Sequence, residues 1–175
     1  MSNADSASRL RRAHAQPTVE ELREIGLFGA LSDEVIGYLA KTLETRLVPP
    51  GETIFREGDP AHDMFVVLDG EVEVVKQSHQ KHDHRVAILG PKDSCGEMSL
   101  IDVQPRSATV RTLAPSRLLR ITSEDFDRLY RHDLKSYALV TLNIARDLSR
   151  RLRVADGILA DFTASVLDHR IKPRL

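Results

Sequence analysis

Residues 64–77 read MFVVLDGEVEVVKQ, two valine-rich runs separated by Gly70. Branched and aromatic side chains favour β-strands because they pack well on a pleated surface. A glycine between two such runs is a turn signal. The stretch therefore predicts one strand over residues 64–70, a turn, and a second strand over residues 71–77.

Similar short runs continue on both sides, from Arg46 to Ile121. They read RLV (46–48), ETIFRE (52–57), RVAILG (85–90), SATVRTLA (107–114) and RLLRI (117–121). Many short strands with regular turn signals are typical of a sandwich, a jelly roll or a small barrel. One segment, CGEMSLID at residues 95–102, breaks the pattern and predicts a short helix between two strands.

Helices are expected before this β-region. Thr18 and Glu21 have the spacing of a capping box, in which each side chain accepts from the other residue's backbone N–H. A short helix should therefore run to about Gly26. Ser32 gives a second N-cap signal, and the apolar residues after it predict a helix to about Leu43.

A long helix is expected after the β-region. Ser123 should cap a helix to about His132, and a helix of about 30 residues, ~45 Å long, should follow from about Asp133. Along it, apolar and small residues recur at alternating steps of four and three: Leu134, Ala138, Thr141, Ala145, Leu148, Leu152, Ala155, Leu159, Phe162 and Val166. This seam favours a homodimer interface, because the helix is longer than the β-domain can cover. The alternative is that it packs on its own domain.

Composition excludes several classes of protein. The chain has 175 residues, which fits one domain, and its 25 basic and 26 acidic residues argue against a surface built for nucleic acid. The single cysteine, Cys95, excludes an internal disulfide and favours a reducing cytoplasm. No apolar run approaches the ~20 residues of a membrane span, and residues 1–16 predict a mobile tail without a signal peptide.

The segment around Gly96 has the chemistry of an anion site. Gly96 is expected to open a short helix after a strand, which leaves backbone N–H groups without partners. Arg106 follows ten residues later, directly after Pro105, and its planar guanidinium suits a phosphate. Glu97 would repel an anion, so it fits better as an acceptor for a hydroxyl group. These residues predict a site for one phosphate and a neighbouring hydroxyl.

These residues also carry a family resemblance. Gly96-Glu97-Met98-Ser99-Leu100 followed by Pro105-Arg106-Ser107-Ala108 resembles the phosphate-binding cassette of the cyclic nucleotide-binding domain, the sensor module of catabolite activator protein, protein kinase regulatory subunits and gated channels. Gly51, Gly58 and Gly70 match turns of that family. The resemblance covers roughly residues 22–162.

The resemblance implies an α+β, mainly β fold: an eight-stranded antiparallel β-roll of the jelly-roll type, with flanking helices and a long C-terminal helix. It implies that Glu97 takes the ribose 2′-hydroxyl and that Arg106 pairs with the cyclic phosphate of cyclic AMP or cyclic GMP. The remaining candidate ligand-binding residues in the motif are Gly96, Met98, Ser99, Ser107 and Ala108. It implies a binding module without catalysis. The alternative is that the fold persists and the ligand function is lost.

Two positions depart from the family pattern. Cys95 stands where the family commonly has phenylalanine, and a small thiol there should loosen the packing beneath the cassette. In the long helix, Ala155 and Asp156 stand where catabolite activator protein has two hydroxyl residues. Asp156 is a candidate base contact, since a carboxylate can accept from guanine N1–H and N2–H. The alternative is that it faces solvent, and the identity of the base stays open.

Two further stretches are rich in histidine or arginine. The segment KQSHQKHDHRV resembles a cupin metal tract through His79, His82 and His84. A cupin needs a glycine where this chain has Lys76, and a glutamate where it has Ile88 or Leu89, so a polar hairpin loop is predicted instead. The arginine cluster at residues 150, 151 and 153 is predicted to be a solvated flank of the helix.

Together these features predict a cyclic nucleotide sensor made of a tail (1–16), a domain (17–162) and a helix end with a basic tail (163–175). Ligand binding should order the helix after Gly96 and bring the long helix over the base. Only 13 residues follow Phe162, too few for a helix-turn-helix domain, so the signal is expected to reach an unknown effector protein. A β-roll used only for protein assembly and a cupin-like metal enzyme are the alternatives.

Overall fold

The computed structural model describes residues 16–78 and 82–171. Two antiparallel four-stranded sheets form a β-roll, in the orders β1-β8-β3-β6 and β2-β7-β4-β5. The strands are β1 (Glu44–Val48), β2 (Thr53–Phe55), β3 (Asp63–Asp69), β4 (Val72–Gln77), β5 (Asp83–Leu89), β6 (Ser94–Cys95), β7 (Thr109–Thr112) and β8 (Ser116–Thr122). The predicted fold class is confirmed. The predicted tail lies almost entirely outside the described residues.

The pattern of branched residues located seven of these strands and missed β6. This strand has only two residues, and it forms by pairing with the middle of β3, Cys95 opposite Phe65 and Ser94 opposite Val66. A strand this short has no periodicity of its own. It is nevertheless important, because it connects the rigid β-roll directly to Gly96 and Glu97.

The alternation of side chains along β3 explains how the two parts of the core are built. Met64 and Val66 point into a cluster shared with the helices, whereas Phe65 and Val67 point into a second cluster between the two sheets. All four side chains are at most 2% exposed. Successive residues of a strand face opposite sides, so β3 anchors both clusters.

The helices are α2 (Val19–Arg23), the 3₁₀ helix η1 (Gly26–Phe28), α3 (Asp33–Thr42), α4 (Met98–Asp102), α5 (Ser123–His132) and α6 (Leu134–Ile171). The predicted capping box of Thr18 and Glu21 is confirmed, and Ser32 caps α3. The prediction that Ser123 is an N-cap was wrong. Thr122 caps α5, because its hydroxyl accepts from the N–H of Asp125 at 3.1 Å while that carboxylate accepts from the N–H of Thr122.

The helix predicted at residues 95–102 is shorter than expected. Cys95 belongs to β6, and Gly96 has φ +83, a left-handed conformation that cannot start an α-helix. The helix α4 begins only at Met98. Gly96 is therefore a turn between strand and helix, rather than the first residue of the helix.

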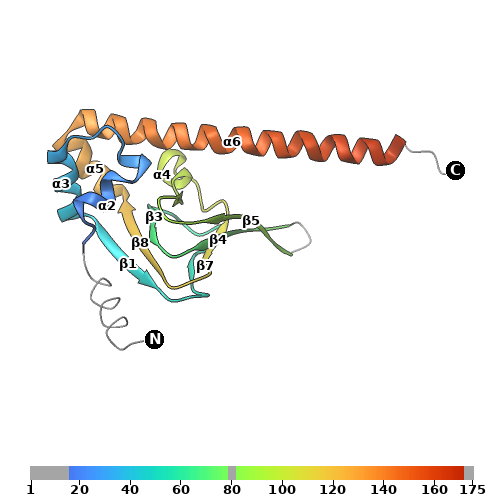
Figure 1. Cartoon of the computed structure of the whole chain (residues 1–175), viewed down its shortest axis with the longest axis horizontal. Coiled ribbons are helices and arrows are strands. Elements are labelled where there is room, and N and C mark those ends of the chain that lie inside the picture. Colours follow the sequence, from blue (N-terminus) through green and yellow to red (C-terminus); the bar gives the residue numbers. More distant parts are fainter. Residues whose placement is uncertain (1–15, 79–81, 172–175) are drawn as a thin grey trace.

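The helix α6 has 38 residues, which makes it about 57 Å long. Figure 1 shows it running along the other helices and α4 and then extending past the β-roll. Its first half is packed, with Val140 and Ile144 at most 2% exposed, whereas residues 152–166 are exposed throughout. It continues through Gly157 and past Phe162, and it is longer than predicted. No helix among the described residues is long and apolar enough to span a membrane.

Candidate functional site

Two segments that are apart in the sequence meet at one cavity. The segment from β6 into α4 and the segment before β7 line an open cavity of about 130 Å³, together with residues of β2, β4, β5 and α6. Seven of the eight predicted ligand-binding residues lie in its wall: Gly96, Glu97, Met98, Ser99, Arg106, Ser107 and Ala108. The eighth, Asp156, is an exposed residue of α6 and lies outside this wall.

Gly96 lets the two segments come close together. A Cβ atom at this position would lie 2.4 Å from Nη1 of Arg106, and the backbone has a positive φ that side chains disfavour. The same guanidinium nitrogen donates to the carbonyl oxygen of Gly96 at 3.2 Å. Glycine is therefore required here both for the turn and for the approach of Arg106.

Arg106 is held in place by the β-roll. Its side chain is only 4% exposed, forms an ion pair with Asp63 at the start of β3, and donates to the carbonyl oxygen of the same residue at 2.6 Å. The carbon atom of its guanidinium lies 3.9 Å from the ring centre of Phe55 in β2. Asp63 also accepts from Arg120 at 2.6 Å. Nε of Arg106 is buried and has no hydrogen-bond partner in the described part of the chain.

Glu97 faces the same cavity with its side chain 5% exposed. Its Oε1 accepts from Nη1 of Arg151 at 3.1 Å, whereas its Oε2 is buried and lacks a partner among the described residues. Burial raises the pKa of Glu97, and the charge of Arg151 acts in the opposite direction. The free oxygen fits the predicted role of Glu97 as an acceptor.

Arg151 is a residue of the site that the sequence analysis missed. It projects from α6, where Nη2 donates to the carbonyl oxygen of Ser94 at 2.8 Å, and it pairs with Asp147 at 2.8 Å. The prediction that it belongs to a solvated flank was therefore wrong. Its position seven residues after the buried Ile144 places it on the packed face of the helix, and that spacing was a usable signal.

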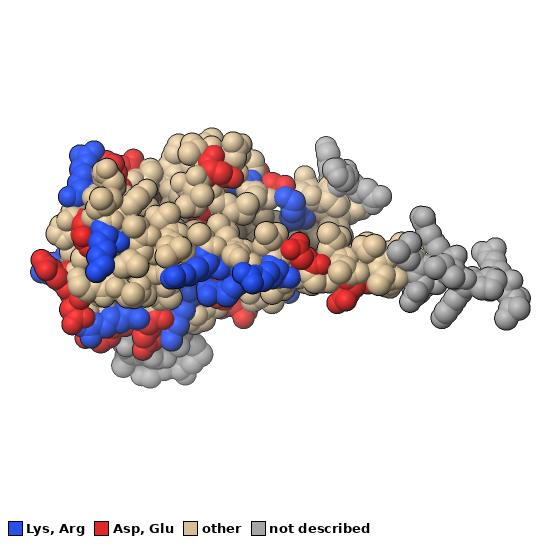
Figure 2. Space-filling model, turned by 90° about the horizontal axis from the view of Figure 1, so that it is seen from above, with Lys and Arg blue, Asp and Glu red and all other residues tan. Residues whose placement is uncertain are grey.

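The neighbouring arginines behave as predicted. Figure 2 shows a band of basic side chains on the outer side of α6. Arg146, Arg150 and Arg153 are exposed and recur along α6 at steps of four and three. Of the cluster, Arg151 alone bonds to Glu97, whereas Arg150 pairs with Asp147 of its own helix.

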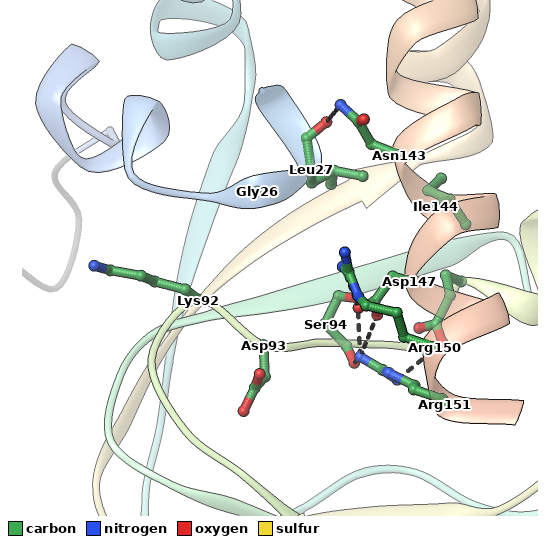
Figure 3. A pocket seen from close by; sticks show the side chains of 11 residues that line it. Gly26, Leu27, Lys92, Asp93, Ser94, Asn143, Ile144, Asp147, Arg150 and Arg151 are labelled. Atoms are coloured by element: carbon green, nitrogen blue, oxygen red, sulfur yellow. Dashed lines mark hydrogen bonds and ion pairs between the residues drawn. The ribbon is translucent and has the colours of Figure 1, made fainter. Parts of the chain in front are cut away.

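A second cavity, of about 180 Å³, lies between α6, η1 and the residues before β6. Figure 3 shows Asn143 directed toward the backbone of η1, and Arg151 beside Ser94 and Asp147. The side-chain amide of Asn143 donates to the carbonyl oxygens of Leu27 and Gly29, both at 3.1 Å. The polar groups that line this cavity bond mainly to one another. These bonds connect α6 to η1 and to the segment around Glu97.

Two further expectations concern Cys95 and the histidines. Cys95 lies in the cluster between the sheets, and burial raises the pKa of its thiol to about 12. The thiol therefore stays protonated near neutral pH. His82 and His84 are exposed, and His79 lies outside the described residues. Among the residues that the structure describes, no cluster of three or more histidine, cysteine or acidic side chains is suited to a metal ion.

The comparisons with known proteins agree with this geometry. Residues 45–133 match the family model of the cyclic nucleotide-binding domain. The CRP-like cAMP-activated global transcriptional regulator of Mycobacterium tuberculosis is 29% identical over 156 residues, which cover 89% of this chain and 68% of the regulator. The cyclic AMP receptor protein of Thermus thermophilus is 35% identical over 130 residues, 74% of this chain and 58% of that protein.

Among solved structures, a cyclic nucleotide-binding domain from Methylobacillus flagellatus superposes with a TM-score of 0.73 at 30% identity, covering 82% of this chain and 81% of the other. The chain spans less than two thirds of the Thermus receptor protein. The region matched by the family model contains the β-roll strands and the cassette and ends just before α6.

Proposed function

Because this chain belongs to the cyclic nucleotide-binding domain family, we propose that it is a regulatory sensor that binds cyclic AMP or cyclic GMP in the cavity between Gly96 and Ala108. One observation carries the proposal. Oε2 of Glu97 and Nε of Arg106 are buried side-chain atoms without a partner in the described chain, and both residues line this cavity. An unsatisfied buried polar group costs about 1–3 kcal/mol, so a ligand that bonds both atoms gains that energy.

The chemistry of the two atoms selects the ligand class. The guanidinium of Arg106 suits an anionic phosphate, and the carboxylate of Glu97 suits a hydroxyl group nearby. The apolar part of the wall, formed by Phe55, Val74 and Leu89, offers a surface for a sugar or base. A ribose with a cyclic phosphate supplies all three features in one small molecule.

The signal would leave the site through α6. Glu97 is bonded to Arg151 of α6. A ligand hydroxyl bound to Glu97 would therefore lie next to the hydrogen bond that connects α6 to the cassette. We infer that ligand binding changes how α6 sits on the domain. The exposed seam beyond Leu152 would then act as the output, through a homodimer or an effector protein. Asp156 remains a candidate for contact with the base only if α6 moves.

The ligand proposal is tested with a thermal-shift panel of cyclic AMP, cyclic GMP and linear AMP. A ligand at 100 times its Kd should stabilise the folded chain by about 2.7 kcal/mol. We expect a shift with a cyclic nucleotide, none with linear AMP, and none in Arg106→Ala. The control Arg131→Ala, an exposed arginine of α5, should behave as wild type. No shift with either cyclic nucleotide would support the β-roll that serves only protein assembly.

The dimer proposal is tested separately by light scattering of wild type and Phe162→Glu. Phe162 is 65% exposed, so the charge should leave the folded domain unchanged. We expect a dimer for wild type and a monomer for the variant. A wild-type monomer at all concentrations, with and without cyclic nucleotide, would refute the seam as a homodimer interface.

A further inference from the structure

A lysine that does not line the cavity also contacts the segment before β7. Lys76, near the end of β4, donates from Nζ to the carbonyl oxygen of Ser107 at 2.8 Å. The same ammonium group pairs with the carboxylate of Glu57 at 3.4 Å. Lys76 does not belong to the cavity wall, whereas Ser107 and Ala108 do. The lysine, itself outside the wall, therefore holds a peptide group between two residues of the wall.

The geometry of a peptide bond gives this contact a consequence for ligand binding. In a trans peptide the carbonyl oxygen and the following N–H point in opposite directions, and the described chain has no cis peptide bonds. When Lys76 holds the oxygen of Ser107, the N–H of Ala108 therefore points away from the lysine. A cation on the carbonyl also polarises the peptide, which makes this N–H a stronger donor.

Glu57 fixes the lysine and ties it to the same segment. Its Oε2 accepts from the N–H of Gln77 at 3.1 Å, and this bond together with Lys76 lowers the pKa of the carboxyl. Its own N–H donates to Oγ1 of Thr109 at 3.0 Å. One residue further, the N–H of Gly58 donates to the carbonyl oxygen of Arg106 at 2.8 Å. The loop after β2 thus holds both ends of the segment from Arg106 to Thr109.

We propose that Lys76 is a positioning residue for the phosphate of the ligand. Held by Glu57, it orients the peptide between Ser107 and Ala108 so that the N–H of Ala108 donates to a phosphate oxygen in the cavity. This inference rests on the proposed function and assigns a role to a residue outside the phosphate-binding motif. Lys76 acts through the peptide and does not touch the ligand.

The test measures the Kd of the preferred cyclic nucleotide by calorimetry for three variants. Lys76→Met keeps the length of the side chain and removes the donor, so the affinity should fall about tenfold, the equivalent of one hydrogen bond. Lys76→Arg retains a donor and should recover most of the affinity. Lys135→Met removes an equal charge from an exposed position on α6 and should leave the Kd unchanged.

A second readout separates positioning from a general effect on structure or charge. The two phosphorothioate diastereomers of the nucleotide each replace one exocyclic oxygen by sulfur, a weaker acceptor. Wild type should discriminate between them, and Lys76→Met should discriminate much less, because the bond that sulfur weakens is already impaired. An unchanged discrimination, or a Kd equal to that of wild type, overturns the role of Lys76 while wild-type binding still supports the sensor. If wild type binds no cyclic nucleotide, both proposals fall.

Discussion

The two ends of the cavity are built differently. At the end proposed to bind the phosphate, here called the phosphate end, Arg106 is held by groups of the β-roll: Asp63 at the start of β3, the ring of Phe55 in β2 and the backbone of Gly96. At the end proposed to bind the ribose hydroxyl, here called the hydroxyl end, Glu97 is held by Arg151 from α6. The first end depends on strands packed in the core, and the second on a helix whose far half is exposed.

This difference assigns the two ends different tasks. Contacts within the β-roll keep Arg106 preorganised, so binding to phosphate requires little rearrangement. The hydrogen bond between Glu97 and Arg151 connects the cassette to α6. A ligand that alters this bond therefore also alters how α6 is held. A ligand moves such an equilibrium only through its differential affinity for the two states. We therefore expect the phosphate end to supply affinity and the hydroxyl end to report occupancy.

The largest effect is expected from breaking the phosphate end. Arg106→Ala removes hydrogen bonds to a charged ligand that are each worth about 1.5–3 kcal/mol, so the Kd should rise by at least about 100-fold. Calorimetry measures this change, and circular dichroism checks that the variant is folded. Arg106→Lys keeps the positive charge but loses the planar guanidinium, so its Kd should lie between those of wild type and Arg106→Ala. A Kd within threefold of wild type would contradict the assignment of Arg106.

A smaller effect is expected at the hydroxyl end. Glu97→Gln keeps the shape of the side chain and removes its charge, which should weaken binding about tenfold by the loss of one charge-assisted hydrogen bond. The 2′-deoxy cyclic nucleotide provides the matched control, because it lacks the hydroxyl. Wild type and variant should bind that analogue equally. If the substitution weakens binding of both nucleotides to the same extent, Glu97 does not contact the 2′-hydroxyl.

A substitution of Arg151 should separate the affinity for the ligand from the response of α6 to the ligand. Arg151→Met removes the contacts with Glu97 and Ser94 and leaves Arg106 intact. The Kd should change by less than about threefold, whereas the ligand-dependent change in hydrogen exchange along α6 should disappear. Arg153→Met, at an exposed position two residues further along α6, is the control. A response of α6 that survives in Arg151→Met would show that another contact carries the signal.

The smallest effect is a dependence on pH. Because burial raises the pKa of Glu97, this carboxyl takes up a proton at a higher pH in the folded chain than in the unfolded one. Its contribution to folding stability is therefore greatest at low pH and declines as pH rises through the raised pKa. Affinity should change in the opposite sense, since the ionised form is the better acceptor. Calorimetry from acidic to neutral pH should show this rise in affinity for wild type and a flat profile for Glu97→Gln.

The sequence allowed prediction of the residues of the phosphate end and of the β-roll, because local signals mark them. Strand runs such as MFVVLDG and the motif around Arg106 are contiguous, and the cavity brings seven predicted residues together. Arg151 was missed although its helical spacing from the buried Ile144 was a usable signal. Asp63 and Lys76 were missed because each acts through a contact between distant segments, such as that of Asp63 with Arg106, 43 positions further along the chain, and no local pattern encodes it. The two-residue strand β6 was missed for the same reason.

Hydrogen exchange of the full chain, with and without the preferred cyclic nucleotide, tests most directly whether this cavity binds the ligand. We predict that the ligand protects residues 96–108 and also changes exchange in α6 around Asn143 to Arg151, which contact η1 and the cassette. The strands β1 and β8, away from the cavity wall, should not respond. Saturating nucleotide that leaves residues 96–108 unprotected would contradict the central claim that this cavity is the ligand site.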